Sequence, residues 1–574
     1  MKELSCYVLM PLMIVLIVAA FSDRVRNRVL SVRAIASLEE RLRMDRKLYW
    51  MAFFLCMAAG ILVRCYRFGV LPLGLNQDGA MAGVEAYCLM MDGVDQHGVS
   101  WPTYFEAWGG SQMSTLYSHI MIPFIRVMGL NRYSLRLPML LASVAMLPLA
   151  WDFARRVAGK GYALLALFVL AINPWHILQS RWAIDCNLMP HVLFIAVYLL
   201  FIGRQKRWAL YLSMVFFALT LYSYGLACFI TPLILLFTAV FYVVKRRVKV
   251  IDLLVCIVIF FGISWPYLYT MAINAFGLET ATLGPFTMPL FPDSVRTKDI
   301  AFMGPNAYQV MLDNMLGSFG TFLLGRPEAS YNAIDWTHSM YLFTPPLIVY
   351  GVYRLWRDRR ELARWDENRP LADGGLLVLI WLLATLFNGS VIGGVINHNN
   401  AIFYPVILIV AYVLWRMGKR LRVALLTALC VYTVSFACLC NTYFADEKYQ
   451  TQAAFLNGLH EALVDTWGWD YDHYYLTSGG DEHRLMNAQV MFAHKIDYSA
   501  LSEATDLIGP DGEPSGWYFT ERYIFTDFSD FEPDPYDCAV YIVEQREKAL
   551  FDAEDYLIYD YGQFAAVYPR YWAE

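Results

Sequence analysis

Two carboxylates stand directly beside runs of apolar residues that are long enough to cross a membrane. Asp78 lies in GLNQDGAMAGVEAY (74–87), just after one run, and Asp185 lies in QSRWAIDCN (179–187), just before another. Acidic residues at such positions are rare unless they have a function. A positioned carboxylate can take the proton of an attacking hydroxyl, so both are candidate catalytic residues. The structural alternative for Asp78 is that it caps the helix predicted for GAMAGVEAY.

Glu85 follows Asp78 by seven residues, which in a helix is two turns and the same face, so it is a third candidate and a helper to Asp78. Asn76 and Gln77 could orient the carboxylate or an acceptor. Other polar side chains that could bind a substrate gather in four segments far apart in the sequence. The first, which follows Asp78, holds Glu106 and Trp108. The second is QSRWAIDCN, with Arg181 and with His176 one turn earlier, and the third and fourth are residues 273–338 with Arg326 and residues 390–399 with His398.

The charge of the chain is divided unevenly between its two parts. Of 574 residues, 58% are hydrophobic and 17% charged, whereas about a quarter are charged in soluble domains. Residues 1–440 hold 24 acidic and 38 basic residues, a balance of +14, and residues 441–574 hold 26 and 7, a balance of −19. This composition indicates a polytopic membrane protein with one attached domain. Nothing in it resembles a nucleic-acid-binding surface.

Apolar runs predict about 12–13 transmembrane helices, since a span needs roughly 20 apolar residues. Basic loops at 24–47, 245–249, 354–360 and 419–422 are expected in the cytoplasm. Counting spans from these loops places both aspartates and the acidic tail on the outer side of the cytoplasmic membrane. The runs lie at 6–21, 49–66, 134–151, 161–177, 187–203, 207–223, 226–243, 250–272, 339–356, 372–389, 400–417 and 421–440, with a shorter one at 114–128.

The chain divides into three parts on these criteria. We expect residues 1–48 to form an anchor helix and a basic cytoplasmic loop, and residues 49–440 to form the transmembrane domain that carries the candidate catalytic residues. Residues 441–574 alternate strand-like pieces such as YYLTS with helix-like pieces such as AAFLNGLHEALV, between glycine and proline turns. They predict a small extracytoplasmic α/β domain.

Metal and nucleotide sites find no support in the sequence. It contains no HExxH helix, no Cys/His cluster with ligand spacing, no Walker loop and no GxGxxG between a strand and a helix. No cofactor is implied, although a requirement for a divalent cation is left open. The substrate that suits this chain is one delivered within the membrane.

Three segments together resemble the GT-C superfamily of membrane glycosyltransferases. They are Asp78 at the head of the first outer loop, GLNRYSLRLP at 129–138 and NPWHILQSRWAIDCN at 173–187. The likeness covers roughly residues 49–440 and is to the bacterial branch of the protein O-mannosyltransferase family, which also resembles the aminoarabinose transferase of lipid A. The pattern departs where Gly79 replaces the glutamate that usually follows the aspartate, where Gln112–Leu116 replace a Pro-Pro-Leu step, and where Asn399 follows His398 in place of arginine.

The resemblance implies an inverting glycosyltransferase that moves a sugar from a polyprenyl-phosphate donor to a hydroxyl of a protein, a glycan or a lipid. Asp78 would be the general base. Arg181, Arg136 and Arg326 would bind the leaving phosphate, because the guanidinium fork matches phosphate oxygens. Arg136 has the alternative of snorkelling from a helix end. Donor, acceptor and membrane lipids are the expected partners.

Two other functions suit a polytopic chain. A transporter or flippase of lipid-linked sugars would place charged or glycine-broken segments at mid-membrane in two related halves. The mid-span positions here are almost all apolar, and no two-half symmetry is visible. A polysaccharide polymerase or ligase would depend on arginine- and histidine-rich outer loops late in the chain, whereas this chain has acidic loops early.

Overall fold

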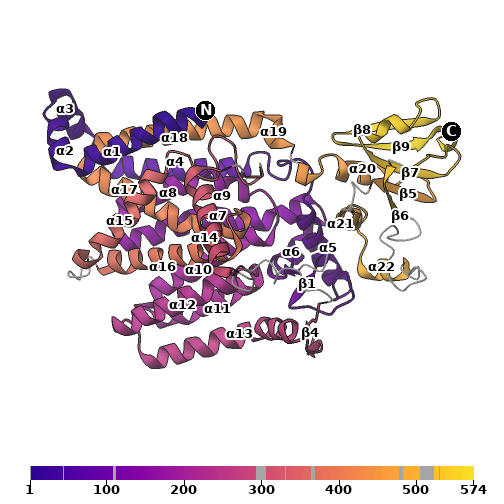
Figure 1. The fold of residues 1–574 in the computed structure, drawn as a ribbon, viewed down its shortest axis with the longest axis horizontal. Coiled ribbons are helices and arrows are strands. Elements are labelled where there is room, and N and C mark those ends of the chain that lie inside the picture. Colours follow the sequence, from indigo (N-terminus) through magenta and orange to yellow (C-terminus); the bar gives the residue numbers. More distant parts are fainter. Residues whose placement is uncertain are drawn as a thin grey trace.

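The computed structural model describes residues 2–42, 44–107, 112–291, 301, 306–326, 328–329, 331–362, 369–451, 453–477, 483–504, 523–528 and 531–573. Figure 1 shows a large bundle of helices followed by a small C-terminal sheet domain at one end of the bundle. The fold class is therefore as expected: a mostly helical membrane protein with a small domain after its last membrane helix.

Nine helical stretches among the described residues are long and apolar enough to cross a membrane. The most buried of them are α10 and the stretch containing α17, which therefore form the centre of the bundle. The nine are Leu4–Phe21 (η1, Leu4–Leu9, and α1, Met10–Phe21), α4 (Arg46–Cys65), α7 (Arg132–Ala158), α10 (Asp185–Gly203), α12 (Ala227–Val244), α13 (Val250–Phe276), Pro370–Ile392 of α16 (Arg369–Ile392), Asn397–Arg420 (η6, Asn397–Ile402, and α17, Phe403–Arg420) and α18 (Arg422–Ala445).

Three further expected spans are helical but shorter or less apolar: α8 (Lys160–Ala171), α11 (Arg207–Ser223) and α15 (Pro345–Leu362). With 12 residues, α8 is about 18 Å long. It stops before Pro174, which begins the short helix α9 (Pro174–Gln179). Proline lacks the N–H that a continuing helix needs but suits a first helical position. The run at 114–128 forms α6 (Leu116–Met128), and the first basic loop forms α2 (Asp23–Leu30) and α3 (Arg33–Arg41).

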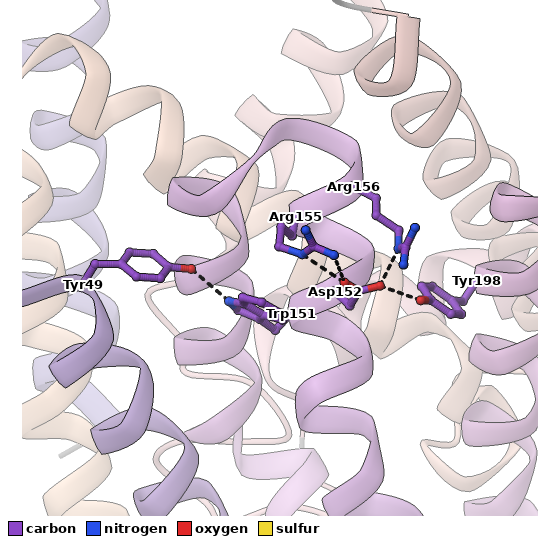
Figure 2. A network of polar contacts seen from close by, with 6 residues as sticks. All are labelled: Tyr49, Trp151, Asp152, Arg155, Arg156 and Tyr198. Atoms are coloured by element: carbon purple, nitrogen blue, oxygen red, sulfur yellow. Dashed lines mark hydrogen bonds and ion pairs between the residues drawn. The ribbon is translucent and has the colours of Figure 1, made fainter. Parts of the chain in front are cut away.

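Polar contacts tie three membrane helices together at one end of the bundle (Figure 2). Asp152 of α7 accepts hydrogen bonds from the two arginines that follow it and from the Tyr198 hydroxyl of α10, the last at 2.6 Å. Trp151 Nε1 donates to the Tyr49 hydroxyl of α4 at 3.0 Å. The opposite end of the bundle is therefore where α4 finishes and where α7 and α10 begin.

Short elements cover that opposite end. α5 (Gln77–Met91) packs on α6, and the hairpin of β1 (Tyr104–Glu106) and β2 (Gln112–Ser114) lies between them in the chain. Val84, Phe105 and Tyr117 belong to the apolar core that these elements enclose. A second hairpin of β3 (Ala281–Leu283) and β4 (Phe286–Met288) and the helix α14 (Ala307–Leu324) come from the later segments.

The C-terminal domain contains a mixed five-stranded sheet of order β6-β5-β7-β9-β8. β5 pairs in parallel with β6 and β7, and β9 pairs antiparallel with β7 and β8. Leu463 of α20 and Val490 of α21 share an apolar core with the sheet. The elements are α19 (Glu447–Gln450), α20 (Leu459–Thr466), β5 (His473–Thr477), α21 (His483–His494), α22 (Tyr498–Ala504), β6 (Tyr523–Thr526), β7 (Ala539–Glu544), β8 (Tyr556–Tyr561) and β9 (Phe564–Pro569).

Candidate active site

The peptide that carries Asp78 is held by the residue just before α5. Asn76 Oδ1 accepts hydrogen bonds from the backbone N–H groups of Asp78 at 3.0 Å and of Gly79 at 3.4 Å, as an N-cap residue does. The alternative in which Asp78 itself caps the helix is therefore wrong. Asp78 lies half-buried in the first turn, where the free N–H groups of a helix favour negative charge.

Gly79 lets the first turn of α5 lie directly against the segment that leads to α10. A Cβ at Gly79 would be 2.9 Å from the carbonyl oxygen of Ala183, closer than side-chain carbons approach. A glutamate at this position, which the resemblance leads one to expect, would not fit without moving this segment. The close contact brings Asp78 beside the loop that carries Asp185.

Asp185 is the first residue of α10 and is half-buried. Its Oδ1 accepts the backbone N–H of Cys186 at 2.6 Å, and its Oδ2 accepts that of Ser114 at 3.3 Å. The second bond ties β2 of the first segment to α10 of the second. Both carboxylates thus lie at the start of a helix.

The third and fourth segments reach the same place through Tyr331 and Glu328. The Tyr331 ring packs edge-on against Trp182, with centroids 5.5 Å apart. Burial raises the pKa of the Tyr331 hydroxyl, and the nearby negative charges of Glu328 and Asp78 raise it further. Glu328 Oε2 accepts the backbone N–H of Ile396 at 3.2 Å. All four segments therefore meet in the neighbourhood of Asp78.

Several buried polar atoms near this meeting point are unsatisfied. Gln179 Nε2 donates to Asn332 Oδ1 at 2.9 Å. Gln179 Oε1, Asn332 Nδ2, Trp182 Nε1 and Asn187 Nδ2 have no hydrogen-bond partner within the part of the chain that the structure describes. Buried polar groups are normally paired, so these atoms are available to a polar ligand or to water.

Arg181 and Arg136 fasten the chain that leads to Asp78. The terminal nitrogens of Arg181 donate to four backbone carbonyls at and just beyond the end of α4, at 2.6–3.3 Å. Such carbonyls have no partner within the helix itself. The terminal nitrogens of Arg136 donate to the carbonyls of Gly69, Pro72 and Gly74 at 2.7–3.1 Å. Both side chains are buried, and both stabilise the segment before α5.

Comparison with known proteins relates this arrangement to solved structures. No family model and no curated protein sequence matches the chain. The chain is similar to ArnT from Cupriavidus metallidurans in the apo state, with a TM-score of 0.52 and 11% identity over 91% of this chain and 98% of that one. ArnT bound to undecaprenyl phosphate gives a TM-score of 0.50 and 12% identity over 90% and 97%. The fold is that of the GT-C membrane glycosyltransferases.

Within this GT-C fold, His176 belongs to a buried chain of hydrogen bonds rather than to an open surface. Arg64 donates from Nη2 to His176 Nδ1 at 2.7 Å, so His176 carries its proton on Nε2, which lies 3.0 Å from the Tyr404 hydroxyl. The same hydroxyl hydrogen-bonds to His191 Nδ1 at 2.6 Å, and His191 Nε2 hydrogen-bonds to Ser143 Oγ at 3.1 Å. Arg64 thus fixes the tautomer of His176. The relay joins α4, α9, α17, α10 and α7.

Glu85 is held by hydrogen bonds to the turn that follows α5. Its side chain is fully buried, and its two oxygens accept hydrogen bonds from Gln96, from Nε2 at 2.7 Å and from the backbone N–H at 3.1 Å. Burial first, and the negative charge of Asp95 second, raise the pKa of Glu85 well above its usual range. The carboxyl group serves as a buried link between α5 and the following turn.

The remaining predicted residues are distributed around the site. Gln77 is the first residue of α5 and Glu106 pairs with Gln112 in the first hairpin, both half-buried. His398 lies in η6, where its carbonyl accepts a bond from Asn388 at 3.0 Å. Arg326 is exposed just after α14. Trp108 lies outside the described residues.

Three contributors to the site escaped the sequence analysis. Arg64 stands near the end of an apolar run, where an arginine usually snorkels to the surface. Glu328 and Tyr331 stand in a long loop with no spacing that marks them.

Among the described residues, no group of three or more His, Cys, Asp or Glu side chains has the arrangement of a metal site.

Proposed function

We propose that the protein is an inverting glycosyltransferase on the outer face of the cytoplasmic membrane. It would move a sugar from a polyprenyl-phosphate donor to an acceptor hydroxyl on a protein, a glycan or a lipid. The observation that carries the proposal is Asp78, a half-buried carboxylate in the first turn of α5, where four segments meet in a GT-C fold. The ArnT structure that holds undecaprenyl phosphate supports the class of donor lipid.

The reaction needs one base and one stabilised leaving group. Asp78 takes the proton of the acceptor hydroxyl while the hydroxyl oxygen attacks C1 of the sugar. The bond between C1 and the phosphate oxygen breaks, and its electron pair leaves with the polyprenyl phosphate. Attack from the face opposite the phosphate inverts the configuration at C1. Asn76 fixes the peptide of the base, and Asp185 orients β2 against α10.

The leaving phosphate would be bound by hydrogen-bond donors that do not already stabilise the fold. Trp182 Nε1 and Asn332 Nδ2 are buried and lack partners among the residues described, and the exposed guanidinium of Arg326 can supply positive charge. Arg181 and Arg136 act indirectly in this scheme, because their terminal nitrogens already bind backbone carbonyls.

An apolar groove of about 530 Å³ supports a lipid-linked donor. It lies between α14, α15, α16 and the start of α17, and apolar side chains form almost all of its lining. On α16 the groove extends from Leu386 to Leu379. Leu379 lies about 20 Å along the helix from its end at Ile392. A polyprenyl chain in this groove would run from the site end of the bundle toward the middle of the membrane. Lining residues include Phe319, Phe322, Val349, Trp356, Leu383 and Val406.

A transfer assay tests the function. The purified protein is incubated with an undecaprenyl-phosphate sugar, and release of undecaprenyl phosphate is followed by mass spectrometry. Lipid-linked sugars and surface glycans of cells with and without the protein identify the sugar and the acceptor. The proposal predicts loss of a surface sugar and accumulation of its lipid-linked form when the protein is absent. Unchanged glycans together with unchanged lipid-linked sugars would contradict it.

A further inference from the structure

The chain that follows the last membrane helix returns to the Asp78 loop and hydrogen-bonds along it. The backbone N–H of Leu73 donates to the carbonyl of Gln450 at 2.9 Å, and that of Leu75 donates to the carbonyl of Phe455 at 2.7 Å. Asn76 Nδ2 donates to the carbonyl of Ala454 at 3.3 Å. The residue that caps α5 is therefore itself held by the start of the C-terminal domain.

A side chain of α21 completes this contact. Gln489 is 1% exposed, and its Nε2 donates to the carbonyl of Leu75 at 2.9 Å. The backbone of Leu75 is thus bound on its N–H side by Phe455 and on its carbonyl side by Gln489. Gly74 has a φ of +80°, and a Cβ there would lie 2.0 Å from the Phe455 carbonyl oxygen. Only glycine allows so close an approach.

The helix α21 also packs along α5 itself, and Figure 1 shows the two side by side between the bundle and the sheet. Phe492 is buried in the same apolar core as α5 and lies within 3.1 Å of the place of a Cβ on Gly83. At the far end of α5, Ser499 Oγ donates to Asp92 at 2.7 Å. Contacts from the C-terminal domain therefore run along the whole helix.

We infer that the C-terminal domain is a working part of the active site and that Gln489 is a positioning residue for the Asp78 loop. Arg136 holds this loop from the bundle side and Gln489 holds it from the domain side. Asp78 follows three residues later, so a displacement of Leu75 moves the carboxylate. This inference rests on the proposed role of Asp78 as the base.

The test removes the Gln489 donor from the full-length protein without changing the size of the side chain. In Gln489→Met, kcat for transfer falls by at least about tenfold, because small displacements of a catalytic group are costly. The KM for the donor stays within about twofold of wild type. Hydrogen exchange, read by mass spectrometry, accelerates in residues 69–79. Gln489→Leu, which also lacks the donor, behaves in the same way and serves if the methionine variant fails to fold.

Thr466→Val is the matched control. Thr466 is buried in the same domain and hydrogen-bonds to Ala462 and Tyr474, without a contact to the Asp78 loop. This variant keeps kcat and the exchange of residues 69–79 unchanged. Wild-type kcat and exchange in either folded Gln489 variant would overturn the inference. The proposed function is judged separately, by the transfer assay on the wild type, and the role of the base by the activity of Asp78→Asn.

Discussion

Asn76 Oδ1 accepts the backbone N–H of Asp78 at 3.0 Å, so the cap of α5 and the proposed base share one turn of chain. Asn76→Ala removes the cap and lowers the free energy of unfolding by about 1 kcal/mol. It also lowers kcat, because the first turn of α5 loses a constraint. Thermal unfolding in detergent and the transfer assay measure the two effects.

Asn76→Ser is the control for that variant, since serine caps helices about as well as asparagine. It loses the contact to Ala454 but keeps the cap, and we expect a smaller loss of stability than in Asn76→Ala. Equal losses in both variants would assign the stabilisation to the Ala454 contact instead.

The buried carboxyl group of Glu85 predicts a pH dependence of stability. Its pKa is raised in the folded protein, by burial first and by the charge of Asp95 second. The folded state therefore binds the proton more tightly than the unfolded chain does. Stability is lost as the pH rises above about 4.3, the ordinary value for glutamate, toward the folded pKa.

In Glu85→Gln the titrating group is absent, and a turned Gln96 amide satisfies the new side chain. As the pH rises above about 4.3, the melting temperature of the wild type should fall more steeply than that of the variant. Parallel profiles for the two proteins would mean that Glu85 is ionised throughout this range.

Variants of Arg181 and Arg326 distinguish an arginine that stabilises the fold from one that binds the ligand. Arg181→Ala leaves four backbone carbonyls near the end of α4 without their donor, and we expect a destabilisation of at least about 3 kcal/mol. Arg326→Ala removes an exposed guanidinium and should leave the melting temperature unchanged while raising the KM for the donor. If Arg181→Ala folds normally but binds the donor more weakly, phosphate binding would be assigned to Arg181 instead.

The orientation of the chain is tested by a reporter that is active only in the cytoplasm. Fused after Glu574 it should stay silent, because the tail carries a balance of −19 and the basic loops belong inside. Fused after Leu42, in the first basic loop, the same reporter should be active. Activity after Glu574 would reverse the assignment of every loop.

Sequence reasoning located most of the membrane helices and singled out Asp78 as a candidate, because both leave local signals: an apolar run of sufficient length and a charge beside it. It missed what holds Asp78. The Gln489 amide and the Leu75 carbonyl are 414 residues apart, and Arg64 and His176 are 112 apart. Pairs like these have no periodicity or spacing. The role of Arg181 was equally hidden, because its partners are backbone carbonyls, which every residue has.

The substitution Asp78→Asn tests the central claim most directly. Asparagine has the same shape but cannot accept the proton as a base, and loss of the charge at the helix N-terminus costs no more than about 1 kcal/mol. General-base catalysis contributes roughly 10²–10⁴-fold. The variant should fold, insert and bind the donor as wild type does, yet transfer sugar at least about a hundredfold more slowly. Transfer by Asp78→Asn at a rate near that of the wild type would contradict the account and direct the search for the base to Asp185 or Glu106.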